Sequence, residues 1–94
     1  MPFPQQTPRA FTRTNIESVN PGQIGVYGIF TLAGCVYIGR GDIRERLLAH
    51  LNGDNVLIAQ QRPTHWLSVV TANHVKREKE LIVEFQPMCN KKVG

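Results

Sequence analysis

The sequence is poor in cysteine and has no long hydrophobic run. Its two cysteines, Cys35 and Cys89, stand far apart and form no C-x-x-C pair, so neither a disulfide framework nor a zinc-binding spacing is present. No secretory h-region and no apolar stretch of membrane-spanning length occurs. We therefore expect a cytoplasmic protein with reduced thiols and no membrane partner.

Acidic residues are few. Seven Asp and Glu stand against 11 Lys and Arg, and the formal net charge is +4. A basic surplus suits a polyanionic partner such as nucleic acid. The length of 94 residues predicts one domain with one compact core.

Prolines concentrate at the start of the chain, and Asn20-Pro21-Gly22 is a turn signal. We divide the chain into an irregular basic leader, residues 1–22, and a domain, residues 23–94. Within the leader, one turn of helix is expected near Asn15 to Val19.

The domain shows strand and helix patterns in alternation. The fold class expected is α/β (α+β): a small three-stranded antiparallel sheet flanked by helices, in the order β-β-α-(α)-β-α. Residues 54–63 are ambiguous. The predicted elements are strands Ile24–Thr31 and Cys35–Gly39 joined by the three-residue loop Leu32-Ala33-Gly34, a helix Asp42–Asn52, a strand Thr64–Thr71 and a helix His74–Phe85.

The helix ends carry their own signals. Asp42 is a good N-cap with Glu45 three residues later, and Gly53 follows the last turn. Asn73 is the expected cap of the second helix, which must end before Pro87.

A lone carboxylate interrupts the apolar stripe of the second helix. Glu78 falls inside the stripe, whereas the other charges of this helix lie outside it. A charge in such a place needs a partner, and a divalent cation or an arginine would serve. The alternative is that Glu78 lies in water at the edge of the domain. The stripe consists of Val75, Leu81, Ile82 and Phe85.

In the first helix, Ile43, Leu47 and Leu51 form the core line. Arg46 and His50 are four residues apart on its border, so both could reach a cleft beside the core. The alternative is a solvated arginine and a surface histidine.

Two tyrosines flank the hairpin. With a three-residue loop, positions of equal parity share a face, which places Tyr27 and Tyr37 on the same side of the sheet. Gly25 and Gly39 leave space beside their rings. Core packing, with each hydroxyl turned to a hydrogen-bond partner, is the alternative.

Together these residues resemble the GIY-YIG nuclease superfamily over about residues 23–92. Val26 replaces the usual isoleucine, Arg40 stands where many relatives have lysine, and a shorter loop leaves Arg44 as the alternative to Arg46. The helical phase favours Arg46. The motifs that carry the resemblance are Gly25-Val26-Tyr27, Tyr37-Ile38-Gly39, Arg46-Leu47, His50, Glu78 and Pro87-Met88-Cys89-Asn90.

The resemblance implies hydrolysis of phosphodiester bonds in duplex or branched DNA with one Mg²⁺ or Mn²⁺ ion. Glu78 would hold the metal, and Arg46 would balance the charge on the phosphate. Tyr27 would activate or position the attacking water, with His50 as the alternative base, since the free pKa of tyrosine is about 10 and that of histidine about 6.5. Tyr37 would orient the water or the phosphate.

The remaining predicted contacts lie around this centre. Arg40, Lys91 and Lys92 would contact DNA phosphates. Asn90 would tie the C-terminal segment to the site through its amide, in either a catalytic or a purely structural role.

Three functions compete at this point: a metal-dependent endonuclease, a nucleic-acid-binding module that is inactive without a partner chain, and a protein-interaction scaffold. The intact motif residues argue against the scaffold. Cutting both strands of a duplex would need a second subunit or a second visit, but no pattern in the sequence points to a homodimer or a partner chain.

Overall fold

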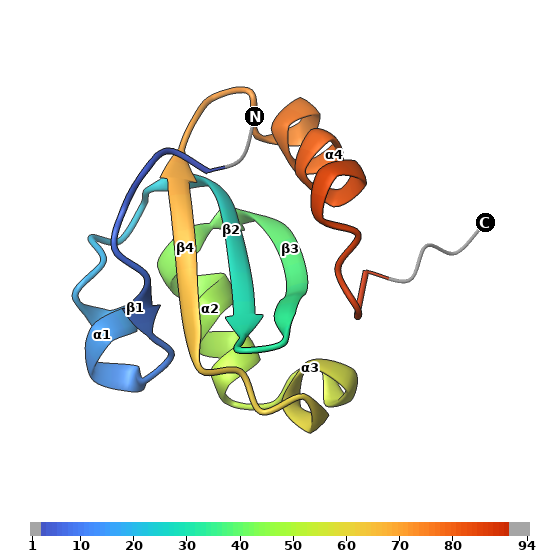
Figure 1. Cartoon of the computed structure of the whole chain (residues 1–94). Helices are drawn as coiled ribbons and strands as arrows, with labels where there is room; N and C mark the ends of the chain where they lie inside the picture. Colours follow the sequence, from blue (N-terminus) through green and yellow to red (C-terminus); the bar gives the residue numbers. More distant parts are fainter. Residues whose placement is uncertain (1–2, 91–94) are drawn as a thin grey trace.

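The structure, a computed structural model, describes residues 3–90. It contains a four-stranded antiparallel sheet with the strand order β1-β4-β2-β3, against which the helices pack (Figure 1). The predicted α+β class is confirmed. The elements are β1 Arg9–Ala10, α1 Arg13–Glu17, β2 Ile24–Thr31, β3 Gly34–Asp42, α2 Ile43–Leu51, α3 Val56–Gln60, β4 His65–Val70 and α4 His74–Phe85.

The sheet has one strand more than the three that we predicted. In β1, Arg9 pairs with Trp66 and Ala10 pairs with His65 of β4. The Trp66 indole also donates a hydrogen bond to the carbonyl of Ala10 at 3.2 Å. Two residues among prolines are too few to display the alternation by which a strand is recognised. Their strand conformation depends on β4, more than fifty residues further along the chain.

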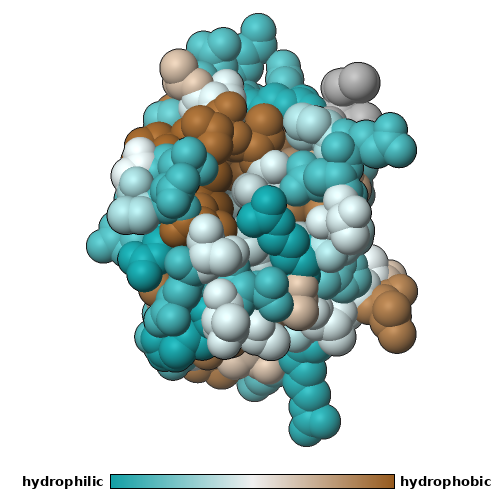
Figure 2. All heavy atoms as spheres, turned by 90° about the vertical axis from the view of Figure 1, so that its left-hand side faces the viewer, coloured by the Kyte–Doolittle hydropathy of each residue, from teal (hydrophilic) through white to brown (hydrophobic). Residues whose placement is uncertain are grey.

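The leader, expected to be irregular, packs onto the sheet through β1 and α1. Ile16 and Val19 are buried on one side of the sheet, and Phe3 is buried on the other. The Gln6 carboxamide bonds both backbone groups of Ser68, donating to its carbonyl at 2.9 Å and accepting from its amide at 3.2 Å. Figure 2 shows the side of the molecule that carries α1 and β1, which is largely hydrophilic, with its largest group of hydrophobic atoms at the upper left.

The hairpin turn differs from the prediction, but the arrangement of the tyrosines does not. Thr31 pairs with Gly34, so the turn has two residues rather than three. A two-residue turn alone would place Tyr27 and Tyr37 on opposite faces. However, the register shifts by one residue near Val36, where β3 bulges, and beyond it Tyr37 pairs with Ile29. The two rings therefore share a face, with their centroids 6.3 Å apart.

The predicted helices form with small changes at their ends. Asp42 caps α2, its carboxylate accepting from the Glu45 amide at 3.0 Å. Asn73 is the N-cap residue of α4, as predicted, but its side chain makes no capping hydrogen bond. The ambiguous stretch contains α3, whose first turn is capped by the side chain of Asn55.

Helices cover the sheet on both faces. The face with Tyr27 packs against α1, α2 and α3, which bury Ile16, Leu47 and Ile58. The opposite face packs against α4, where Leu81 is buried. Cys35 and Cys89 form no disulfide with each other, and Cys35 is buried. Among the described helices, none combines the length and the apolar character that crossing a membrane requires.

Candidate active site

A chain of hydrogen bonds links Tyr27 of β2 to the end of α2. The Tyr27 hydroxyl lies 2.7 Å from Nε2 of His50, and Nδ1 of His50 lies 2.9 Å from Oδ1 of Asp54. A carboxylate can only accept, so Nδ1 of the neutral imidazole carries the proton and Nε2 accepts from Tyr27. Tyr27 and His50 are buried, with 1% and 3% of their surface exposed.

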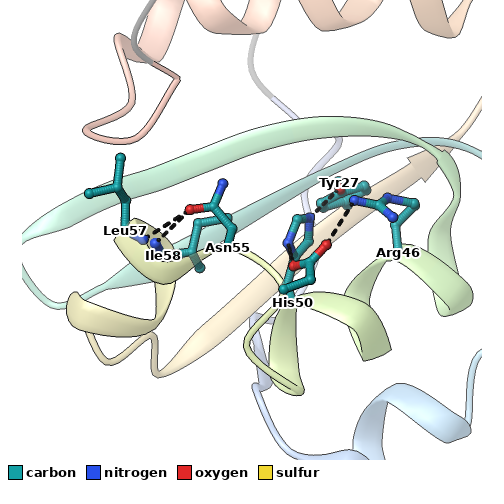
Figure 3. A network of polar contacts seen from close by, with 7 residues as sticks. Tyr27, Arg46, His50, Asn55, Leu57 and Ile58 are labelled. Carbon is teal, nitrogen blue, oxygen red and sulfur yellow. Dashed lines mark hydrogen bonds and ion pairs between the residues drawn. The ribbon is translucent and has the colours of Figure 1, made fainter.

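Arg46 joins this group through the same carboxylate. Its Nη2 donates to Oδ2 of Asp54 at 3.3 Å, so the two oxygens of Asp54 hold two different predicted site residues. Figure 3 shows Arg46 and His50 reaching toward Tyr27 from α2. Arg46, and not Arg44, therefore stands beside the tyrosine, as the helical phase predicted.

Burial sets the protonation states of this group. Desolvation, with a smaller contribution from Tyr37, raises the pKa of Tyr27 above its ordinary value, and Arg46 only partly opposes the rise. Desolvation also lowers the pKa of His50, although Asp54 acts in the opposite direction. Near neutral pH, His50 is thus a neutral acceptor and Tyr27 a protonated phenol. Of the two candidate bases, His50 is the one that presents a neutral acceptor nitrogen, Nε2, to the Tyr27 hydroxyl.

Tyr37 packs beside His50. Its ring makes an edge contact with the imidazole, with centroids 5.1 Å apart. Burial raises the pKa of Tyr37, and the negative charge of Glu78 raises it further.

Glu78 forms an ion pair with Arg40. Its Oε1 lies 3.1 Å from Nε of Arg40, and the two side chains are 21% and 44% exposed. An arginine is one of the two partners, with a divalent cation, that we expected for a carboxylate in the apolar stripe. Arg40, which we expected on a phosphate, here neutralises the carboxylate.

Glu78 alone supplies too few ligands for Mg²⁺, so phosphate oxygens of the substrate would have to complete the coordination. Within residues 3–90, no three or more His, Cys, Asp or Glu side chains gather in a way that could hold a metal ion. Magnesium keeps several waters and binds through one or two carboxylates plus phosphate oxygens. A single accessible carboxylate such as Glu78 suits that mode, provided that Arg40 releases it.

Two motif glycines are required by close packing. A Cβ on Gly39 would overlap the Tyr27 hydroxyl and lie 2.8 Å from the Tyr37 ring. A Cβ on Gly25 would overlap the backbone of Val69 on β4. Gly39 thus leaves room for the side chains of Tyr27 and Tyr37, whereas Gly25 allows β2 and β4 to approach each other closely.

Asn90 has a backbone partner. Its carboxamide accepts from the amide of Ile38 at 2.6 Å and donates to the carbonyl of Ile38 at 2.9 Å. The preceding residues follow the same strand, with Cys89 donating to Val36 at 2.8 Å. The contacts of Asn90 are those of the structural role left open above. Lys91 and Lys92 lie outside the described residues.

Asp54 is the site residue that sequence reasoning missed. It follows α2 and belongs to no predicted motif, and our prediction assigned no role to residues 54–63. The signal available was Gly53: a glycine just past a helix end folds the chain back over the last turn. That fold places the next residue near position 50.

No protein-family model, no curated protein and no solved structure matches this chain.

Proposed function

We propose that this protein is a divalent-metal-dependent endonuclease that hydrolyses phosphodiester bonds in DNA. The observation that carries the proposal is the 2.7 Å hydrogen bond between Tyr27 and His50, next to Arg46. The site thus brings together a neutral base, a hydroxyl and a fixed cation. In phosphodiester hydrolysis a base and a hydroxyl can activate the attacking water, and a cation can balance the charge on the phosphate. The negative charge of Glu78, which contributes to the raised pKa of Tyr37, supports a role for this carboxylate in the same site.

The proton path follows from the protonation states. As water attacks phosphorus, its proton passes to the Tyr27 oxygen while the Tyr27 proton passes to Nε2 of His50. The phenol never needs to ionise in advance, which removes the difficulty of its raised pKa. Because Tyr27 is 1% exposed in the free protein, the proposal requires DNA binding to uncover the edge of its hydroxyl.

Charge on the phosphate is balanced by Arg46, whose guanidinium Asp54 holds beside Tyr27. Burial lowers the pKa of Arg46, but the hydrogen bonds and charges of Tyr27 and Asp54 outweigh burial, and the net shift is upward. When bound at Glu78, a Mg²⁺ or Mn²⁺ ion would polarise the phosphate and stabilise the departing 3′ oxygen. Arg40, once released from Glu78, is free to contact a neighbouring phosphate.

The test is cleavage of supercoiled plasmid with Mg²⁺ or Mn²⁺, comparing the wild type with Glu78→Gln. Glu80→Gln is the matched control, because Glu80 lies on the same helix and pairs with Arg77 at 3.1 Å. We expect nicking or linearisation by the wild type and Glu80→Gln, and none by Glu78→Gln or in EDTA.

DNA binding is measured on the same samples by gel shift. If the wild type binds DNA without cleaving it under any of these conditions, the nuclease proposal fails and the binding-module alternative is favoured. If it neither binds nor cleaves, the scaffold alternative is favoured.

A further inference from the structure

We infer that Asp54 is a positioning residue that holds His50 in the tautomer able to accept the Tyr27 proton and fixes Arg46 beside it. This inference rests on the proposed function for its effect on cleavage. Its effect on the histidine does not depend on that function. None of the motifs in the sequence includes Asp54.

The backbone conformation at the end of α2 fixes the position of Asp54. Gly53 adopts φ +88°, in the left-handed region. The Gly53 amide then donates to the carbonyl of His50 at 3.1 Å, and the Asp54 amide donates to that of Ala49 at 3.1 Å. These two bonds are the Schellman pattern of a helix C-terminus. They turn the chain back so that the Asp54 carboxylate faces the last turn of α2.

The carboxylate divides its oxygens between two partners. Oδ1 lies 2.9 Å from Nδ1 of His50, and Oδ2 lies 3.3 Å from Nη2 of Arg46. Its side chain is 39% exposed, whereas that of His50 is 2% exposed. A partly solvated carboxylate contributes less through charge than a buried one, so its main contribution here is orientation.

Orientation matters because the two nitrogens of imidazole exchange roles with the tautomer. With the proton on Nδ1, Nε2 has a free lone pair and accepts from Tyr27. With the proton on Nε2, the same nitrogen is a donor and cannot take a proton. When Asp54 accepts from Nδ1–H, it selects the first form and stabilises the imidazolium that follows proton transfer.

The charged and titratable groups around His50 are few. Tyr27 faces it from β2 and Tyr37 from β3. Arg46 and Asp54 act on it from α2 and the turn that follows. The neighbouring helix α3, Val56–Gln60, has no titratable side chain. Among these groups Asp54 is the one that raises the pKa of His50.

The experiment compares the wild type with Asp54→Asn, Asp54→Glu and the control Glu17→Gln. Glu17 is also a surface carboxylate in an ion pair, at 3.5 Å from Arg13 and 44% exposed. Two quantities are measured: the His50 tautomer, by ¹⁵N–¹H correlation NMR, and the plasmid-cleavage rate as a function of pH.

We expect the wild type to carry the proton on Nδ1. Asp54→Asn should populate the Nε2–H form and lower the cleavage rate about 10²-fold, within the range of general acid–base effects. Its ascending pH limb should move to lower pH, because the group that raises the pKa of His50 is gone. Asp54→Glu should recover part of the cleavage rate and move the ascending limb of the pH profile part of the way back to its wild-type position. Glu17→Gln should match the wild type in both quantities. A purely structural role would lower the rate without moving the limb.

The inference is overturned if Asp54→Asn keeps the wild-type tautomer, rate and pH limb. If Asp54→Asn does not fold, Asp54→Ser is measured instead. It removes the same carboxylate, and the same results would support or overturn the inference. A wild type that shows the Nδ1–H tautomer and loses it in Asp54→Asn, yet never cleaves DNA, rejects the proposed function and leaves the positioning of His50 intact.

Discussion

The hydroxyl of Tyr27 and Nε2 of His50 lie 2.7 Å apart, and both residues are almost entirely removed from solvent. Deleting the Tyr27 hydroxyl would therefore leave Nε2 of His50, a buried acceptor, without this hydrogen bond. This pair supports the fold and, in the proposed mechanism, moves the proton. Substitutions there should affect stability and activity by separable amounts.

Tyr27→Phe removes only the hydroxyl. We expect the free energy of unfolding to fall by about 1–3 kcal/mol, since Nε2 of His50 loses its buried partner, and the cleavage rate to fall about 10²-fold or more. Urea denaturation and plasmid cleavage measure the two effects. Tyr37→Phe serves as the comparison. If Tyr27→Phe cleaves DNA as fast as the wild type, Tyr27 is not on the proton path.

Stability should depend on pH through His50. Burial lowers its pKa in the folded state, so between that value and the unfolded value of about 6.5 the unfolded chain binds more protons. The contribution of His50 is therefore present above about pH 6.5 and is lost as the pH falls through the folded-state pKa. Urea midpoints measured from pH 8 to pH 5 should decline in the wild type and in His65→Gln. They should decline less in His50→Gln, and equal slopes in all three would refute the assignment.

The identity of the functional arginine can be tested with matched substitutions. Arg46→Lys keeps the charge but loses the planar fork that reaches both Asp54 and the phosphate, and should lower the cleavage rate about 10²-fold. Arg44→Lys, two residues earlier on the same helix, should cleave near the wild-type rate. The reverse ranking would make Arg44 the functional arginine.

Gly39 should tolerate no side chain. In Gly39→Ala the new methyl group would overlap the Tyr27 hydroxyl and press on the Tyr37 ring. We expect destabilisation of about 1–3 kcal/mol, as for other overpacked sites, together with loss of the aromatic shifts of the two tyrosines in NMR spectra. Ala33→Ser, at the exposed hairpin turn, is the control. A stable Gly39→Ala with unchanged spectra would show that the ring contacts are loose.

Local signals predicted much of this fold. The cap at Asp42 and the bounds of α4 follow from short-range chemistry and were confirmed. Tyr27 and Tyr37 share a face as predicted, although for a different reason: a two-residue turn and a bulge together give the parity expected from a three-residue loop. A bulge has no reliable sequence signature, because it depends on how two strands twist against each other.

Features that depend on distant residues escaped prediction. The strand β1 exists because β4 offers backbone partners to Arg9 and Ala10. The pairing of Arg40 with Glu78 needs β3 and α4 to be adjacent. In these two cases the missing information was spatial. Asp54 differs, because it joins His50 through a helix end for which Gly53 is a local signal.

Side-chain amides bond the backbone of two strands, the edge strand β3 and the inner strand β4, and this arrangement provides the last prediction. Asn90 bonds both backbone groups of Ile38 on β3, as Gln6 does with Ser68 on β4. Asn90→Asp can still accept from the Ile38 amide but can no longer donate to its carbonyl.

We expect Asn90→Ala to lower the free energy of unfolding by about 1–3 kcal/mol, the value of two hydrogen bonds, and Asn90→Asp to lower it by a similar amount, because its carboxylate would face the carbonyl oxygen. Hydrogen exchange should speed up at the Ile38 amide in Asn90→Ala and remain unchanged there in Gln6→Ala, which removes the amide bonded to Ser68 on β4. If Asn90→Asp keeps wild-type stability yet loses cleavage, the role of Asn90 is catalytic and the structural interpretation is wrong.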